Sequence, residues 1–144
     1  MYSRGVVPLI LGFALAPPPV PAWIDRAHVA PASFIVTYRI ANVLGSPVPE
    51  GITVDRDPTG GTLGVSVIDS RFDPPRIVNQ GTVKGNTVRW LRAGTRDGLP
   101  HEIAVDAVDK GTETAYLFRV GPKFNLVLVR KTHGQNISPR VFSH

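Results

Sequence analysis

The amino-acid sequence predicts an all-β protein, a single antiparallel β-sandwich of about eight strands with an extended, proline-rich N-terminal arm. Three observations lead to this expectation. Short runs of alternating apolar and polar residues recur between residues 34 and 130, no helical period interrupts them, and the 144 residues include 14 glycines and 14 prolines. Glycine and proline at this frequency favour turns and extended backbone over helix.

The clearest strand covers residues 102–107, where Ile103, Val105 and Ala107 alternate with the more polar positions between them. Similar patterns predict further strands at 34–40, 51–56, 63–67, 75–83, 86–92, 112–120 and 124–131. Turn-forming sequences separate them at 57–61, 85–86 and 109–111, and Gly85-Asn86 is typical of a two-residue hairpin. From the strand count we expect a jelly roll first and an immunoglobulin-like sandwich second.

The apolar positions of these strands are the expected core. These positions are Phe34, Val36, Tyr38, Val65, Val67, Trp90, Ile103, Val105, Phe118, Leu126 and Leu128. The segment Phe124–Val129 differs from the others because it is apolar on both faces. It either lies centrally under a covering segment or presents one face to a partner.

Residues 1–31 are expected to form the arm, and residues 32–144 the sandwich with a short C-terminal tail. The arm contains Pro8, Pro17, Pro18, Pro19 and Pro21, each of which fixes the backbone angle φ. An extended segment cannot bury its own apolar side chains, so they must contact this domain or a neighbouring subunit. The expected partner-binding residues of the arm are Val6, Leu9, Ile10, Leu11 and Phe13.

The same leader has features of a secretory signal, because Arg4 precedes an apolar run that ends in Ala14-Leu15-Ala16. Pro8 interrupts this run, however, and Pro17 would directly follow the cleavage point. The run is also shorter than the roughly 20 apolar residues that cross a bilayer. We therefore expect an arm and no membrane anchor.

The chain carries 16 basic and 11 acidic residues, and twelve of the basic residues are arginine. Arginine pairs with carboxylate or phosphate through a planar, two-pronged group. Arg89, Arg92 and Arg96 lie on or just after one predicted strand and are the candidate contacts for a partner's carboxylates. The basic residues lack an interleaved aromatic motif, so no specific nucleic-acid binding is expected.

The sequence provides no clear signature of catalysis or of a cofactor. Cysteine is absent, which excludes disulfides, iron–sulfur clusters and thiol catalysis. Residues 55–66 begin like a calcium loop, but Ser66 stands where a bidentate Glu should close the cage. The four histidines have no zinc spacing, and neither a nucleophile elbow nor a phosphate loop occurs. We expect no enzyme, no metal and no cofactor, although a serine triad assembled by geometry stays open.

Residues 88–105 contain a strand with Trp90, the turn Gly94-Thr95-Arg96-Asp97-Gly98 and then an alternating strand. This stretch resembles one that is common in small β-sandwich proteins of tailed-phage virions. A short sandwich with an N-terminal arm is also similar to the head decoration, or cement, proteins of such phages. The resemblance implies a structural protein of the capsid surface whose partners are the major capsid protein, other virion subunits or further copies of itself. The alternative is a secreted or periplasmic sandwich that binds carbohydrate or protein, with the leader as its signal.

Overall fold

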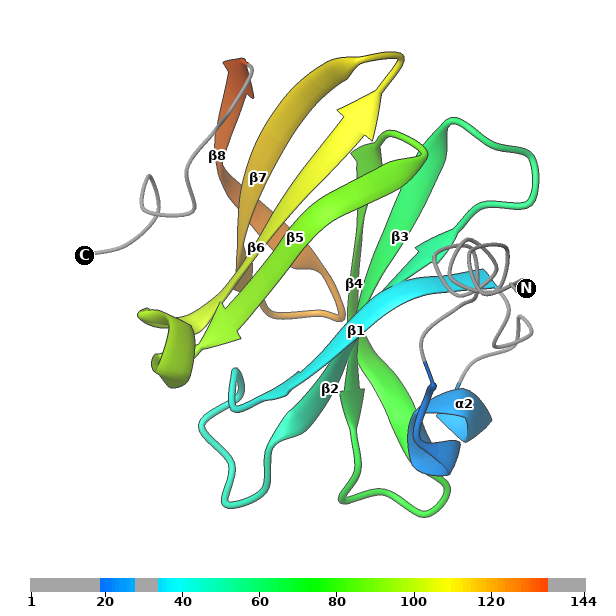
Figure 1. Cartoon of the computed structure of the whole chain (residues 1–144). Coiled ribbons are helices and arrows are strands. Elements are labelled where there is room, and N and C mark those ends of the chain that lie inside the picture. Colours follow the sequence, from blue (N-terminus) through cyan, green and yellow to red (C-terminus); the bar gives the residue numbers. More distant parts are fainter. Residues whose placement is uncertain (1–18, 28–33, 135–144) are drawn as a thin grey trace, which may run out of the picture.

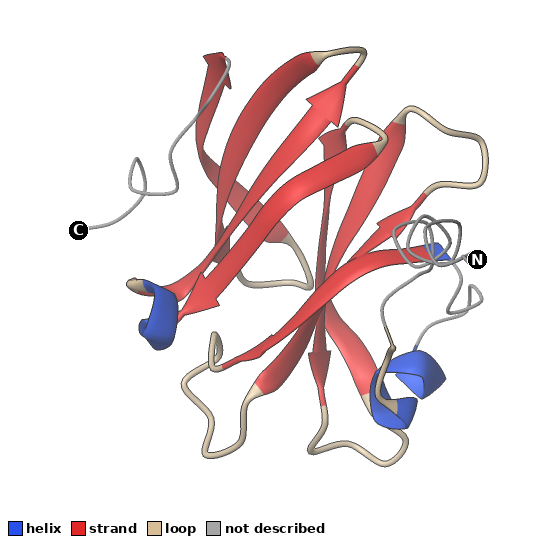
Figure 2. Cartoon of the chain, viewed as in Figure 1, coloured by secondary structure: helices blue, strands red, loops and turns tan. Residues whose placement is uncertain are grey.

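Two four-stranded antiparallel sheets pack face to face and form the body of the protein (Figure 1 and Figure 2). The computed structural model describes residues 19–27 and 34–134. The first sheet consists of β1 (Ile35–Ala41), β2 (Glu50–Arg56), β3 (Thr62–Asp69) and β4 (Arg76–Lys84). The second consists of β5 (Thr87–Gly94), β6 (Leu99–Asp109), β7 (Thr112–Val120) and β8 (Leu126–Gly134). The predicted all-β sandwich of eight strands is therefore confirmed.

Each sheet is a meander, in which strands that follow one another in the chain pair with one another. A jelly roll or an immunoglobulin-like sandwich would contain Greek keys, in which a fourth strand returns to lie beside the first. The orders β1-β2-β3-β4 and β5-β6-β7-β8 contain no such return, so the expected topology is corrected. The physical reason is that short connections join neighbouring antiparallel strands, whereas a Greek key needs one long connection.

The expected hairpin at Gly85-Asn86 is a passage between the sheets. β4 pairs with β3, and β5 pairs with β6. The Gly85 N–H donates to the Gly61 carbonyl and the Asn86 N–H to the Val108 carbonyl, both at 3.0 Å. A Cβ at Gly85 would lie 2.9 Å from the Val108 oxygen. The glycine is needed because the chain passes close to β6 where it changes sheet.

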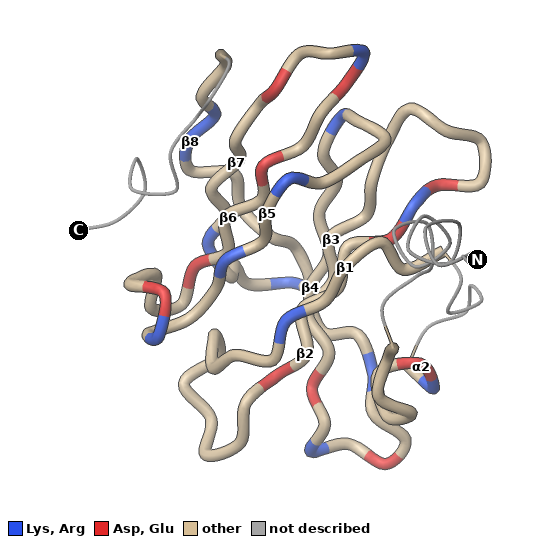
Figure 3. The backbone as a smooth tube through the Cα atoms, viewed as in Figure 1, with Lys and Arg blue, Asp and Glu red and all other residues tan. Residues whose placement is uncertain are grey.

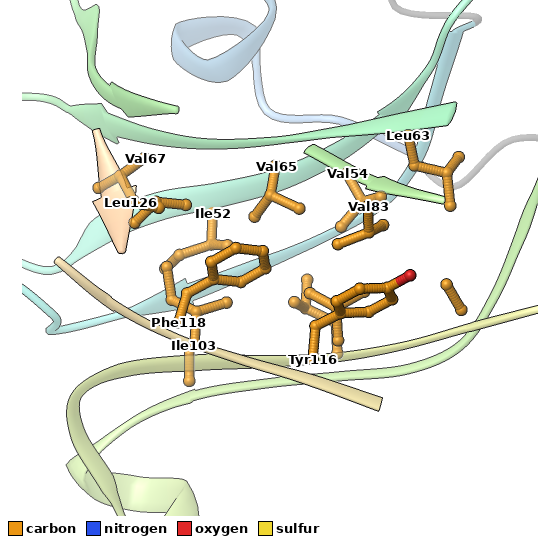
Figure 4. Close-up of a cluster of buried hydrophobic side chains, with 14 of the residues drawn as sticks. Ile52, Val54, Leu63, Val65, Val67, Val83, Ile103, Tyr116, Phe118 and Leu126 are labelled. Atoms are coloured by element: carbon orange, nitrogen blue, oxygen red, sulfur yellow. The ribbon is translucent and has the colours of Figure 1, made fainter. Parts of the chain in front are cut away.

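The main hydrophobic core lies between the two sheets (Figure 4). Tyr116 and Phe118 of β7 point toward the valines of the first sheet, and their rings lie 6.3 Å apart in nearly parallel planes. Of the predicted core residues, six are buried here, namely Val65, Val67, Ile103, Val105, Phe118 and Leu126. Val36 is partly buried and packs against this cluster. Phe34 is also partly buried.

Three other predicted core residues lie elsewhere. Tyr38 packs in a cluster with helix α2 (Ala22–Ala27), and Trp90 in one with Leu99 and Leu117. These small clusters are separate from the core between the sheets. Leu128 is 48% exposed, so its assignment to the core was wrong. The reason is that β8 is the last strand of its sheet and lies at the edge.

Helix α2 lies within the stretch that was expected to be extended. Its Ile24 is fully buried, and Trp23 and Ile24 pack over Gly51 of β2. A Cβ at Gly51 would be 3.0 Å from the Trp23 ring, so the absence of a side chain makes room for the helix. The arm residues expected to bind a partner, Val6, Leu9, Ile10, Leu11 and Phe13, lie outside the described residues.

The sequence that begins like a calcium loop forms a turn, as preferred from the sequence. The Asp57 carboxylate accepts hydrogen bonds from the Thr59 N–H at 3.0 Å and from the hydroxyls of Thr59 and Thr62. The hydrogen bond from the Thr59 N–H makes the largest contribution to lowering the pKa of Asp57, and the two hydroxyl groups add to it. The carboxylate thus organises the link between β2 and β3.

Candidate interaction site

The structure separates the three arginines that were expected to bind a partner. Arg89 and Arg92 lie on β5, and Arg96 lies on the short 3-10 helix η2 (Thr95–Asp97). Basic and acidic positions are adjacent along this end of β5 and the turn that follows (Figure 3). Arg92 and Arg96 lie near the C-terminal end of β5, and Arg92 contacts Asp97 there. Arg89 lies nearer the start of β5 and forms an ion pair with Glu113 of β7.

A cleft of about 570 Å³ lies where the edge strands β1 and β5 of the two sheets approach each other. Its lining comes from both sides: Tyr38, Arg39, Ile40, Ala41, Asn42, Ala93, Thr95 and Arg96. The cleft is within the size range of small-ligand pockets, and it also suits the side chains of a protein partner.

Gly94 permits this close approach of the two edges. Its φ of 77° is a conformation that side chains disfavour, and a Cβ there would lie 3.0 Å from the Cβ of Ala41 and 3.1 Å from the Asn42 carbonyl oxygen. Gly98 has a similar φ of 75° but faces open space. Gly94 is therefore required both by its backbone angle and by close packing, whereas Gly98 is required by its backbone angle alone.

Asp97 connects the turn to β1. Arg39 contacts it with both prongs of its guanidinium, Nη2 at 2.7 Å from Oδ1 and Nε at 2.6 Å from Oδ2. The Ala93 N–H also donates to Oδ2, at 2.9 Å. Burial acts to raise the pKa of Asp97, but these hydrogen bonds and the charges of Arg39 and Arg92 outweigh it and hold the pKa below its ordinary value. Asp97 is therefore ionised at neutral pH.

The cleft carries an excess of positive charge. Arg39 and Arg96 line the cleft, and Arg39 and the neighbouring Arg92 contact the carboxylate of Asp97. The three arginines exceed this one carboxylate by two positive charges. In the described ranges, Arg96 has no carboxylate within 4.0 Å, and its side chain is exposed. Arg39 is already held in place by Asp97, so part of the site is pre-organised. Such an arrangement is suited to binding carboxylate groups of a partner.

A second charged group lies across the strands of the second sheet. Arg89 of β5 reaches over β6 and donates to both carboxylate oxygens of Glu113 on β7, at 2.8 and 2.9 Å. Asp106 of β6 is fully buried beside them. Burial above all, together with the neighbouring acid Glu113, raises the pKa of Asp106 to about 7. Arg89 acts in the opposite direction.

Sequence reasoning found Arg92 and Arg96 but missed Arg39 and Asp97. Arg39 and Asp97 are 58 residues apart, and no local pattern connects them. The available signals were weak: Arg39 occupies a polar position of a predicted strand, and Asp97 lies between the glycines of the turn. Only the pairing of the two sheet edges brings them together.

Neither a metal site nor a membrane-spanning helix is found within residues 19–27 and 34–134. No three His, Asp or Glu side chains gather there in a way that could hold a metal ion. No helix in these ranges has the length and apolar character needed to cross a membrane. Comparison with known proteins finds no match, neither to a family model nor to a curated protein or a solved structure.

Proposed function

We propose that the protein is a non-enzymatic structural protein of a phage virion, a capsid cement or decoration protein that binds and stabilises neighbouring capsid subunits. The observation that supports this function is the basic cleft, which Arg39 and Arg96 line and beside which Arg92 and the single acid Asp97 lie. The virion setting comes from the resemblance of residues 88–105, which include the turn that borders the cleft.

The chemistry of the cleft favours binding over catalysis. Arginine does not release its proton at neutral pH, and the lowered pKa of Asp97 keeps that carboxylate charged. A general acid or base works best with a pKa near the operating pH, which neither group has. Fixed charges of this kind attract and orient a charged partner.

The test uses the full chain and shells of the corresponding phage that were assembled without it. Binding is measured by co-sedimentation for the wild type, for Arg96→Glu and for Arg56→Glu as the control. Arg56 is also exposed but lies at the end of β2, away from the cleft. We expect Arg96→Glu to weaken binding at least tenfold, a loss of about 1.4 kcal/mol, while the control binds normally. Equal binding by both variants would show that the cleft is not the contact.

A second candidate is a secreted or periplasmic module that binds carbohydrate or protein. The observation in its favour is the apolar leader with Ala14-Leu15-Ala16 as a cleavage site. N-terminal sequencing of the protein from its natural source separates the two candidates. A virion protein should begin at or next to Met1, whereas a secreted protein should begin after Ala16.

A further inference from the structure

β8 forms the outer edge of the second sheet, and Val127, Leu128 and Val129 in its first half are apolar and exposed. Among the described residues, seven large hydrophobic side chains are exposed, and four of them lie between positions 124 and 129. They are Phe124, Val127, Leu128 and Val129, with exposed fractions of 50, 47, 48 and 41%. β8 is therefore not central in its sheet, as one of the two expectations had it, and the other expectation was a partner for one face.

In the described part of the chain, the other three edge strands, β1, β4 and β5, each contact a segment of the opposite sheet or of the loop before β8. β1 and β5 approach each other along the basic cleft. At the edge of β4, the Gln80 N–H donates to the Phe124 carbonyl oxygen at 3.0 Å. Beyond Asn125, β8 pairs with β7 on one side, and no described strand pairs with it on the other.

The first half of this free edge lacks the usual protection against pairing, whereas the second half carries Arg130 and Lys131. Edge strands of soluble proteins usually carry charges or prolines that keep other strands away. The segment Phe124–Val129 contains neither, and the first charge is that of Arg130. An unprotected apolar edge is a template for an added strand, which is a common mode of peptide recognition.

The leader contains a segment that fits this edge. Leu9–Ala16 has eight residues without proline or charge, bounded by Pro8 and Pro17, and β8 has nine residues. In a strand, alternate residues share a face. One face of this segment would carry Leu9, Leu11, Phe13 and Leu15, and the other would carry the smaller set Ile10, Gly12, Ala14 and Ala16. When the main chains pair, the large side chains can lie beside the exposed side chains on one face of β8, such as Val127 and Val129.

The sequence between the leader and the domain favours a contact between two copies. Buried Ile24 fixes helix α2 to the first sheet. Four of the five residues from 17 to 21 are proline, and such a sequence favours a stiff extended spacer of about 3.1 Å per residue, or roughly 15 Å in all. We expect such a spacer to direct Leu9–Ala16 away from the domain that carries it and toward a second copy.

We propose that Leu9–Ala16 of one copy adds as a strand to the free edge of β8 in a second copy. The proposal deepens the assembly role given above and rests on it. Because donor and acceptor are different surfaces, the contact is heterologous, and repeated use of it produces a ring or an extended array. Such a network of copies would complement the attachment of each copy to the shell through its cleft.

Disulfide trapping tests the contact directly, because the chain has no cysteine of its own. Full-length Leu11→Cys and Val127→Cys are mixed in equal amounts and oxidised mildly. We expect a mixed dimer that forms at least tenfold faster than in a mixture of Leu11→Cys with Val48→Cys. Val48 is a matched control, since its exposed fraction is 44% and it lies in the link between β1 and β2.

Three results would overturn the proposal. One is a yield of mixed dimer no higher than that of the control mixture. Another is a double variant, Leu11→Cys with Val127→Cys, that closes the disulfide within single chains even when dilute, because the leader would then occupy its own β8. A dimer formed by Val127→Cys alone at the rate of the mixture would indicate edge-to-edge pairing and would also contradict the proposal.

A charge on the edge provides an independent measurement. Val127→Lys with Val129→Lys should raise the dissociation constant for self-association at least tenfold in analytical ultracentrifugation, while Val48→Lys should not. Circular dichroism checks that both variants keep their strands. Failure of the proposed function would differ in its readout, because Arg96→Glu is expected to lose shell binding and still form the mixed disulfide.

Discussion

At the scale of single residues, two buried carboxyl groups have their pKa values shifted in opposite directions. Asp97 has a lowered pKa because hydrogen bonds and two arginines outweigh its burial. Asp106 has a pKa of about 7 because it is fully buried and faces the acid Glu113, with only Arg89 acting to lower it. The first group is a fixed charge, whereas the second changes its protonation near neutral pH.

The raised pKa of Asp106 predicts that stability falls as the pH rises. Between the unfolded value of 3.8 and about 7, the folded protein holds a proton that the unfolded chain has released. The stabilisation is complete below the lower value and is lost as the pH passes the upper one. Asp106→Asn, which keeps the shape without the charge, should flatten this decline and be more stable than the wild type at pH 8 by on the order of 2 kcal/mol.

Urea unfolding at pH 5, 6, 7 and 8 measures the effect. The difference between the wild type and Asp106→Asn removes the contribution of the histidines, which both proteins share. Parallel pH profiles for the two proteins would contradict the shifted pKa of Asp106.

Arg39 and Arg96 line the same cleft but should differ in their effect on stability. Arg39→Ala removes the two-pronged contact to Asp97, whose side chain is mostly buried, and should lower the free energy of unfolding by about 1–2 kcal/mol. Arg96→Ala removes an exposed side chain and should change it by less than about 0.5 kcal/mol. Urea denaturation of both variants checks this, and equal losses would mean that Asp97 does not depend on Arg39.

At the scale of elements, the approach of β5 to β1 depends on Gly94. Gly94→Ala and Gly98→Ala impose similar backbone strain, because the φ angles are 77° and 75°. Only Gly94→Ala also places a methyl group against Ala41 and Asn42. We expect Gly98→Ala to cost about 1 kcal/mol and Gly94→Ala about 1–3 kcal/mol more in thermal or urea unfolding. Equal losses would indicate that the two edges can separate without cost.

The elements themselves were largely predictable, but their arrangement was not. Apolar patterning and turn residues located all eight strands, and in most of them burial of one face imposes a period of two. Gly85-Asn86 was misread because the same two residues suit a hairpin and a passage between sheets, and distant carbonyls at Gly61 and Val108 decide between them. Helix α2 was missed because six residues are too few to establish a helical period.

The same limit applies to the candidate site. Arg92 and Arg96 were predicted because they lie close in the sequence, near one strand and its turn. Arg39 joins them through the packing of two sheet edges, which depends on contacts between distant residues. Sequence patterns relate residues that are close in the chain. The arginines near β5 could therefore be predicted from the sequence, whereas the contribution of β1 could not.

At the scale of the whole molecule, the two proposed contacts rely on different forces. The cleft would bind its partner through arginine charges, whereas the edge of β8 would bind the leader through main-chain hydrogen bonds and apolar burial. The Debye length falls from about 10 Å at 0.1 M salt to about 3 Å at 1 M, which weakens the attraction between exposed charges. Apolar contacts are not screened in this way.

Salt should therefore separate the two contacts in one protein. Between 0.1 and 1 M sodium chloride, we expect co-sedimentation with shells to fall at least tenfold, while the yield of the disulfide between Leu11→Cys and Val127→Cys stays within about twofold. Both readouts use the full chain at the same protein concentration. If shell binding is unchanged by salt, an apolar surface makes that contact and not the arginines. If the disulfide yield falls with salt as steeply as shell binding, charge holds the copies together, and the apolar edge of β8 is not where the leader docks.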